Sequence, residues 1–138
     1  MEAQLRQEED GRIIAANSNQ RILLSDRSAI DPVVYAVLTS RTESDARDRR
    51  NKLVNLPKFQ LTLPMYRQAI FILLKPVPEW LVDDGVRSLD NQTQCLSVFR
   101  TTLTELGIVY EEMGGEMKDL NKRVSKVLEY VSISQLNL

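Results

Sequence analysis

The sequence predicts an α/β domain with a mainly parallel sheet, and two observations lead to this fold class. Short apolar runs without polar alternation, which suit strands covered on both faces, occur at 22–25, 69–74 and 108–110. Segments with helix signals precede, separate and follow these runs. The expected order is therefore helix, strand, helix, helix, strand, helix, strand, helix, which is typical of a parallel α/β sheet.

The first half of the chain supplies one strand and three helices. Residues 1–20 are polar and predict a helix that is interrupted or ended near Gly11. The run 22–25 predicts the first strand, and 29–38 predicts the helix that follows it. Residues 42–52 are dense in charges of both signs, which predicts an exposed helix with i,i+4 ion pairs.

The second half supplies two strands and two helices. Residues 56–64 contain two prolines and predict a connection, and 69–74 predict the clearest strand of the chain. Residues 93–106 show helical spacing, and the run 108–110 starts a third strand. Gly114–Gly115 predict a turn into a last helix with one apolar face. That face carries Leu120, Val124, Val127, Leu128 and Val131.

Composition limits the classes of function. The 138 residues fit one domain, 1–138, with a formal net charge of −1, which argues against a dedicated nucleic-acid binder. The lack of histidine excludes Ser-His-Asp and Cys-His catalysis and the usual Cys/His zinc site. The single cysteine, Cys95, excludes an internal disulfide. Because no apolar run could span a bilayer and no signal peptide is evident, we expect a cytoplasmic protein without a membrane span.

The first candidate site follows the first predicted strand, because ligands of parallel sheets bind at the carboxyl ends of strands. Asp26 beside Arg27 suits phosphoryl transfer, with the carboxylate on Mg²⁺ and the guanidinium on a phosphate. Ser28 and Asp31 are the candidate substrate contacts. The alternative is a helix start capped by Ser28 or Asp31, with a surface ion pair, which is a common structure.

Two further candidates lie later in the chain. Residues 79–88 hold carboxylates, a glycine and Arg87, which would suit a mobile lid or a polar turn before the next helix. Trp80 is expected to be a packing anchor. Gly114–Gly115 would let a nucleotide base approach the main chain, or would simply make a tight turn. The basic cluster in 47–52 is expected to be a solvated helix face.

Three blocks in this order carry a family resemblance: Ile22–Ala36, Phe71–Arg87, and Leu103–Met113 with Arg123 downstream. They resemble P-loop kinase-like AAA domains related to NadR-type ribosylnicotinamide kinases and to nucleoside and thymidylate kinases. The resemblance covers about 20–131. Its most specific elements are the Asp-Arg-Ser-x-x-Asp-Pro motif that begins at Asp26 and the Asp-Gly-x-Arg motif that begins at Asp84.

The resemblance implies a three-layer P-loop kinase-like domain that uses ATP and Mg²⁺ to phosphorylate a nucleoside-like acceptor. It puts Asp26 and Arg27 at the metal and phosphate side, with Asp26 as the metal ligand. Arg87 would be a lid arginine placed by Asp84, and Asp31 would face the acceptor. Gly114 and Gly115 would then border the nucleotide.

One element of such kinases is missing. No Gly-x-x-x-x-Gly-Lys-Ser/Thr segment, whose amides and lysine hold phosphates, occurs in the 138 residues. We therefore expect a domain without the first strand and P-loop, and little or no kinase activity. Either the strands at 22–25 and 69–74 pair directly, or the chain is the carboxyl-terminal part of such a domain. A partner's strand in the resulting gap would make a dimer. The alternatives are a non-catalytic binding or scaffold module of kinase-like shape, which takes a nucleotide, lipid headgroup or protein partner, and a helical interaction domain.

Overall fold

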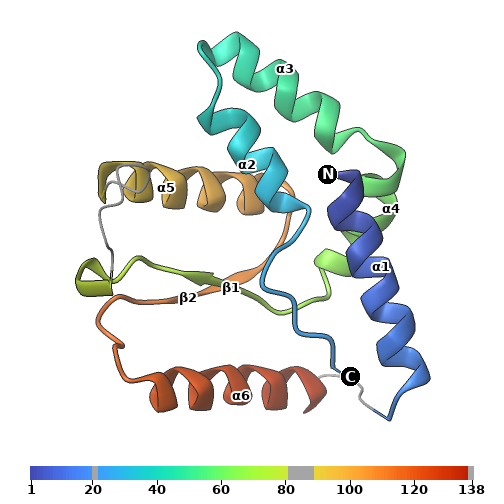
Figure 1. The fold of residues 1–138 in the computed structure, drawn as a ribbon, viewed down its shortest axis with the longest axis vertical. Coiled ribbons are helices and arrows are strands. Elements are labelled where there is room, and N and C mark those ends of the chain that lie inside the picture. The colour runs from blue at the N-terminus through green and yellow to red at the C-terminus, as the bar shows by residue number, and fades with distance from the viewer. Residues whose placement is uncertain (20–21, 81–88, 137–138) are drawn as a thin grey trace. The chain divides into compact units, whose positions relative to one another are not determined.

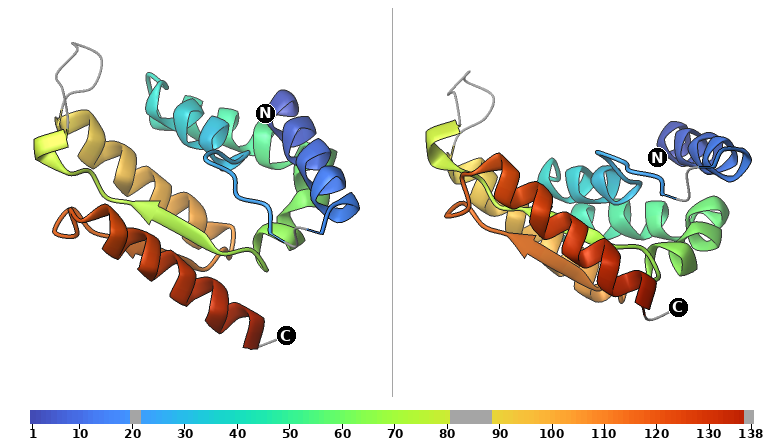
Figure 2. Two further views of the ribbon diagram at one scale, coloured as in Figure 1. Left: turned by 60° about the horizontal axis from the view of Figure 1, so that its bottom comes forward. Right: turned by 90° about the horizontal axis from the view of Figure 1, so that it is seen from below.

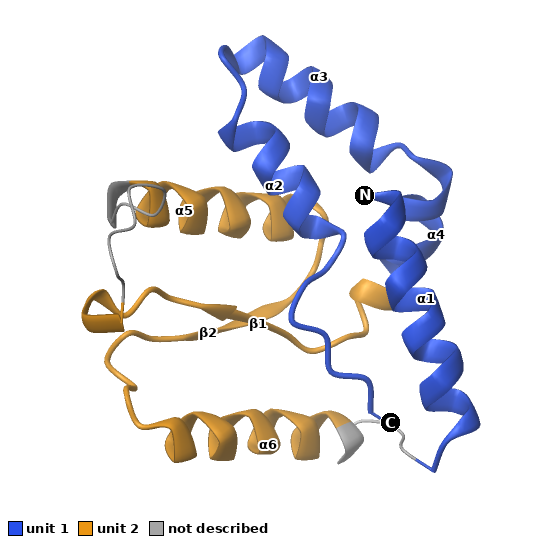
Figure 3. Ribbon diagram, viewed as in Figure 1, with its two compact units in different colours: residues 1–64 blue, residues 65–138 orange. Residues whose placement is uncertain are grey.

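The computed structural model describes residues 1–19, 22–80 and 89–136, and these fall into two compact units. Unit 1 comprises Met1–Pro64 and unit 2 comprises Met65–Leu138 (Figure 3). Helices dominate the first unit, and the strands of the described residues lie in the second (Figure 1). No helix among the described residues is long and apolar enough to cross a membrane.

The described residues of unit 1 form three complete helices and most of a fourth. They are α1 Glu2–Asn17, α2 Ile30–Leu38, α3 Glu43–Val54 and α4 Pro57–Tyr66. Helices α2 and α3 are in contact, and α2 contributes the side chains of Ile30, Val33 and Val34, which are at most 1% exposed. Helix α3 buries no residue, as its charge density predicts. Thr42 caps it by accepting from the Asp45 amide at 3.1 Å, and Asp45 pairs with Arg49.

The predicted strand at 22–25 is wrong. These residues belong to no helix or strand, and Ile22, Leu23 and Leu24 are 54%, 44% and 87% exposed. An apolar run indicates only that its side chains favour burial. A strand also needs a neighbouring strand, because its main-chain N–H and C=O groups must find hydrogen-bond partners. No strand pairs with this run in the described part of the chain.

Two further sequence expectations in this unit are wrong. The predicted connection at 56–64 is helix α4, because Pro57 occupies the first helical position, where its missing N–H costs nothing, and Pro64 lies in the last turn. Its buried residues follow helical spacing: Phe59, Thr62, Leu63 and Tyr66.

Helix α1 runs through Gly11 without interruption, and a Cβ at Gly11 would lie 3.2 Å from Leu23 Cδ1. The glycine therefore lets the following segment pack against the helix.

Unit 2 is built on a parallel β–α–β arrangement. Strand β1 Phe71–Leu74 pairs with β2 Tyr110–Met113, with Phe71 opposite Tyr110 and Leu74 opposite Met113. Helix α5 Leu89–Glu105 connects the strands, and α6 Leu120–Leu136 follows β2. Helices α5 and α6 lie on opposite sides of the strand pair (Figures 1 and 2). The parallel pair confirms the α/β class, whereas the three-layer arrangement of a whole domain stays a prediction.

Local signals place the ends of these elements. Gly107, with φ of 68°, ends α5 in a Schellman motif in which Ile108 N donates to Leu103 O at 2.9 Å. Strand β2, which corresponds to the third predicted strand, begins at Tyr110, two residues beyond the start of the predicted run. The run starts later as a strand because the amide of Ile108 donates its hydrogen bond to the end of α5. The predicted apolar face of α6 is only half covered, since Leu120, Val124 and Leu128 are 67%, 58% and 59% exposed.

Candidate functional site

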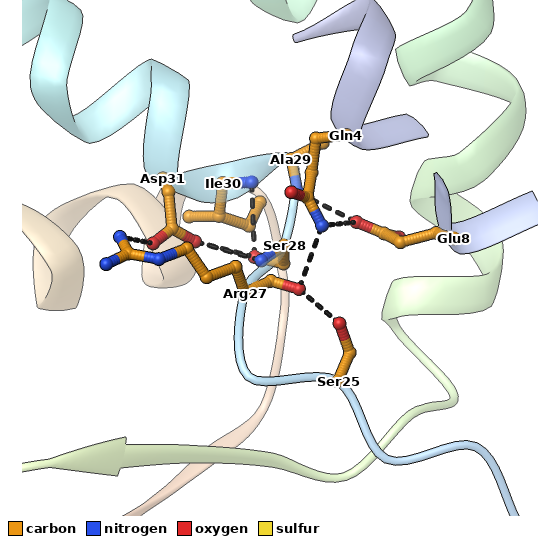
Figure 4. A network of polar contacts seen from close by, with 8 residues as sticks. All are labelled: Gln4, Glu8, Ser25, Arg27, Ser28, Ala29, Ile30 and Asp31. Atoms are coloured by element: carbon orange, nitrogen blue, oxygen red, sulfur yellow. Dashed lines mark hydrogen bonds and ion pairs between the residues drawn. The ribbon is translucent and has the colours of Figure 1, made fainter. Parts of the chain in front are cut away.

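The predicted substrate contacts Ser28 and Asp31 lie in the turn 26–31 that leads into α2, here called the α2 turn. The main-chain amides of residues 28–31 in this turn donate hydrogen bonds to acceptors within the chain (Figure 4). Ala29 N donates to Glu8 Oε1 at 3.1 Å, and Ile30 N donates to Ser28 Oγ at 3.2 Å. Asp31 N donates to Ser28 O at 3.1 Å, while Ser28 N donates to Asp31 Oδ2 at 3.0 Å. Ser28 and Asp31 are therefore hydrogen-bonded to each other in the turn that leads into α2, whose N-cap residue is Ala29.

Arg27 points back to its own helix. Its Nη1 lies 3.3 Å from Asp31 Oδ1, and its side chain is 58% exposed. The pKa of Arg27 is raised, first by a side-chain hydrogen bond with Tyr35 and then by the charge of Asp31. Water screens this exposed pair, so its contribution to stability is small. The guanidinium lies at the predicted site, but the chain's own oxygen atoms already partner it.

Asp26 is exposed in the bend before Arg27. Across 1–19, 22–80 and 89–136, no group of three or more His, Cys, Asp or Glu side chains is arranged to hold a metal ion. Among these residues, Asp26 is therefore not part of a cluster of three or more such ligands. The lid residues Asp84 and Arg87 lie outside the described residues.

The glycine pair after β2 serves close packing between two loops. A Cβ on Gly115 would lie 2.7 Å from the carbonyl oxygen of Pro76, in the segment that follows β1. A Cβ on Gly114 would overlap the side-chain carboxylate of Glu116. The space that a nucleotide base would need beside Gly115 is thus taken up by the main chain of Pro76.

The structure contains two polar groupings near the carboxyl ends of the strands that the sequence pattern does not predict. Arg123 of α6 lies over the ring of Trp80, with its Cζ 4.7 Å from the ring centroid. The same guanidinium donates to Met117 O at 2.5 Å and to Gly114 O at 3.2 Å. Trp80 is 48% exposed, so it is an anchor on one side only. Arg123 therefore joins the loop after β2 to the segment after β1.

The second grouping connects α5 to the sheet. Arg100 binds Glu112 of β2 through two hydrogen bonds, and Lys75 Nζ lies 4.0 Å from Glu112 Oε2. The hydrogen bonds from Arg100 are the main reason that the pKa of Glu112 is lowered. Beyond this pair, Lys118 pairs with Glu79, which lowers the pKa of Glu79. These contacts depend on the β1–β2 register and therefore on the tertiary fold.

An open groove of about 510 Å³ lies between α1 and residues 23–25 in unit 1. Its walls combine exposed aliphatic side chains, among them Ile14 and Leu24, with the charges of Arg6 and Asp10. Glu8 lies at the side of this groove nearest the α2 turn.

A family model described as an AAA domain matches residues 1–119. The match covers most of the chain, which therefore belongs to this family of P-loop NTPase-like proteins. The parallel β–α–β arrangement of unit 2 agrees with such a fold. No curated protein and no solved structure matches the chain.

The phosphates and the base of ATP, which this family implies, do not fit the two candidate cradles among the described residues. A phosphate at a helix N-terminus needs free N–H groups, and those of Ala29, Ile30 and Asp31 have acceptors within the chain. The place beside Gly115 is filled by Pro76.

Proposed function

We propose that the chain is a P-loop kinase-like domain related to NadR-type ribosylnicotinamide and nucleoside kinases. Its ancestral reaction is phosphoryl transfer from ATP–Mg²⁺ to a nucleoside-like acceptor. The 138 residues by themselves do not carry out this transfer. The AAA domain match, the parallel strand pair and the Asp26–Pro32 motif support the ancestry.

The main support for the proposed lack of kinase activity is that the hydrogen-bond donors of the α2 turn are already bonded within the chain. A transferred phosphoryl group needs donors that are free to bind it as charge develops. Here the Ala29 amide is bonded to a buried carboxylate, Glu8, and Ser28 and Asp31 are bonded to each other. An incoming phosphate would have to displace an anion that is already in place and would lose the hydrogen bonds that order the turn.

The second candidate function is a non-catalytic binding or scaffold module that keeps the kinase-like shape. One observation favours it: Arg27 and Gly115, two of the predicted site residues, face groups of the chain itself, namely the Asp31 carboxylate and the Pro76 carbonyl oxygen. A catalyst needs the same groups free to bind its substrate, whereas a scaffold does not. The two candidates therefore differ in whether a nucleotide binds at all.

Two measurements on the 138-residue chain test the proposal. The first is ATP turnover with Mg²⁺ and a panel of nucleosides, compared with the Asp26→Ala and Arg27→Ala variants. We expect no turnover above the protein-free rate, whereas turnover that either variant abolishes would overturn the claimed inactivity.

The second measurement is thermal unfolding of the chain with and without Mg²⁺–ATP. A midpoint raised by nucleotide supports a retained nucleotide site, and an unchanged midpoint supports a scaffold that binds no nucleotide.

A further inference from the structure

Helix α1 contacts the α2 turn through two polar side chains that lie one helical turn apart (Figure 4). Gln4 Nε2 donates to the main-chain oxygen of Arg27 at 3.1 Å, and Glu8 Oε1 accepts from Ala29 N at 3.1 Å. Gln4 Nε2 also lies 3.2 Å from Glu8 Oε1, so the two side chains form one linked group. The main chain on both sides of Ser28 is therefore held by α1.

Burial makes the Glu8 contact strong. The residue is only 6% exposed, and a carboxylate taken out of water is stable only when hydrogen bonds and charges replace its hydration. Here the Ala29 amide and the Gln4 amide supply hydrogen bonds, and Arg12 Nη1 lies 3.8 Å away. Loss of the carboxylate would also leave the buried Ala29 amide without this acceptor.

The rest of α1 is attached at few points. Leu5 and Glu8 are its buried residues, while Ile13 and Ile14 are 54% and 69% exposed. By contrast, α2 buries three aliphatic side chains almost completely and contacts α3. Because elements with little buried apolar surface open at low free energy, α1 can leave its position more easily than α2 can unfold.

We propose that α1 is a detachable clamp on the turn that carries Asp26, Arg27 and Asp31. Gln4 and Glu8 are positioning residues that fix the main chain at Arg27 and Ala29. Release of α1 loosens this turn while α2 and α3 remain folded. The coupling is a property of unit 1 and does not depend on whether the proposed kinase ancestry is correct.

Amide hydrogen exchange, followed by NMR on the full chain, tests the clamp. In Glu8→Ala, we expect exchange at Ala29 to accelerate roughly 10- to 100-fold, because a hydrogen bond to a charged group is lost. Exchange at Asn55, whose amide donates to Asn51 O at the end of α3, stays within about twofold of its original rate. Glu8→Gln restores slow exchange at Ala29, because its amide oxygen still accepts the hydrogen bond.

Matched variants decide between a clamp and a purely structural helix. Glu9→Ala removes an exposed carboxylate from the same helix and leaves exchange at Ala29 unchanged. Gln4→Ala, at a half-buried position, accelerates exchange at Ala29 severalfold. The clamp is overturned if Ala29 exchanges normally in Glu8→Ala, or if Glu8→Gln fails to restore protection. It is equally overturned if Glu8→Ala unfolds α3 or the whole chain, because α1 would then be an inseparable part of the unit.

Discussion

Arg100 and Glu112 form a two-point contact between α5 and β2, with Nε 2.5 Å from Oε1 and Nη2 2.8 Å from Oε2. Such a pair of parallel hydrogen bonds sets the orientation of both side chains as well as their separation. It connects the crossover helix directly to the strand that the helix precedes. The pair is therefore expected to influence both the stability of unit 2 and its response to pH.

The pH dependence of stability follows from the lowered pKa of Glu112. A carboxyl group with a lower pKa in the folded protein stabilises the fold above its ordinary value of 4.5, and this contribution is lost as the pH falls through the folded value. We expect Glu112→Gln to reduce the fall in unfolding free energy between neutral and acid pH. Denaturant titrations at several pH values measure it, with Glu111→Gln, on the same strand, as the control.

The same pair predicts a direct titration shift. In Arg100→Ala, the NMR titration midpoint of the Glu112 carboxyl group rises toward its ordinary value, because the hydrogen bonds from Arg100 are the largest cause of the lowered pKa. Arg100→Lys recovers only part of the shift, since an ammonium group cannot form the two parallel bonds. An unchanged midpoint in Arg100→Ala would contradict this assignment.

Gly115 is expected to tolerate no side chain. The Cβ of Gly115→Ala would lie 2.7 Å from the carbonyl oxygen of Pro76, and main chain must move to accommodate it. Overpacking of this kind costs about 1–3 kcal/mol of unfolding free energy. Gly114→Ala is the matched control, because the atoms that its Cβ would meet belong to the movable side chain of Glu116. Equal losses in the two variants would argue against packing as the cause.

Trp80, the sole tryptophan, reports on the contact with Arg123. Arg123→Ala removes the cation over the ring and two hydrogen bonds to loop carbonyls. We expect a red-shifted emission spectrum and stronger quenching by acrylamide, because the ring becomes more accessible to water. Lys122→Ala, on the exposed neighbouring position, leaves both measurements unchanged. A change of the same size in Lys122→Ala would mean that the fluorescence responds to general loosening of α6.

Helix α4 predicts contrasting effects for two apolar residues. Phe59 is fully buried, whereas Leu61 is 76% exposed. Phe59→Ala should lower the unfolding free energy by about 3–5 kcal/mol, and Leu61→Ala should change it by less than about 0.5 kcal/mol. Chemical denaturation measures both. Similar losses at the two positions would mean that this segment does not pack as the helix that the structure shows.

Local sequence determined the elements whose signals are complete within a few residues. The charged α3 helix with its Thr42 cap and the end of α5 before Gly107 both follow from neighbouring residues. The hydrogen bond from Ser28 N to Asp31 Oδ2 belongs to the same class, because both partners lie within one turn. Side-chain hydrogen bonding and backbone conformation over such short distances need no knowledge of the rest of the fold.

Tertiary structure decided the rest, because the partners lie far apart in the chain. The apolar run at 22–25 has the composition of a strand but no strand beside it, and composition alone cannot supply one. Glu8 accepts from an amide 21 residues away, and Arg100 meets Glu112 only through the β1–β2 register. The sequence indicates which groups are candidates for a phosphate site. Only the folded chain shows that Glu8 and Asp31 accept from the amides of the α2 turn and that the Pro76 carbonyl oxygen lies against Gly115.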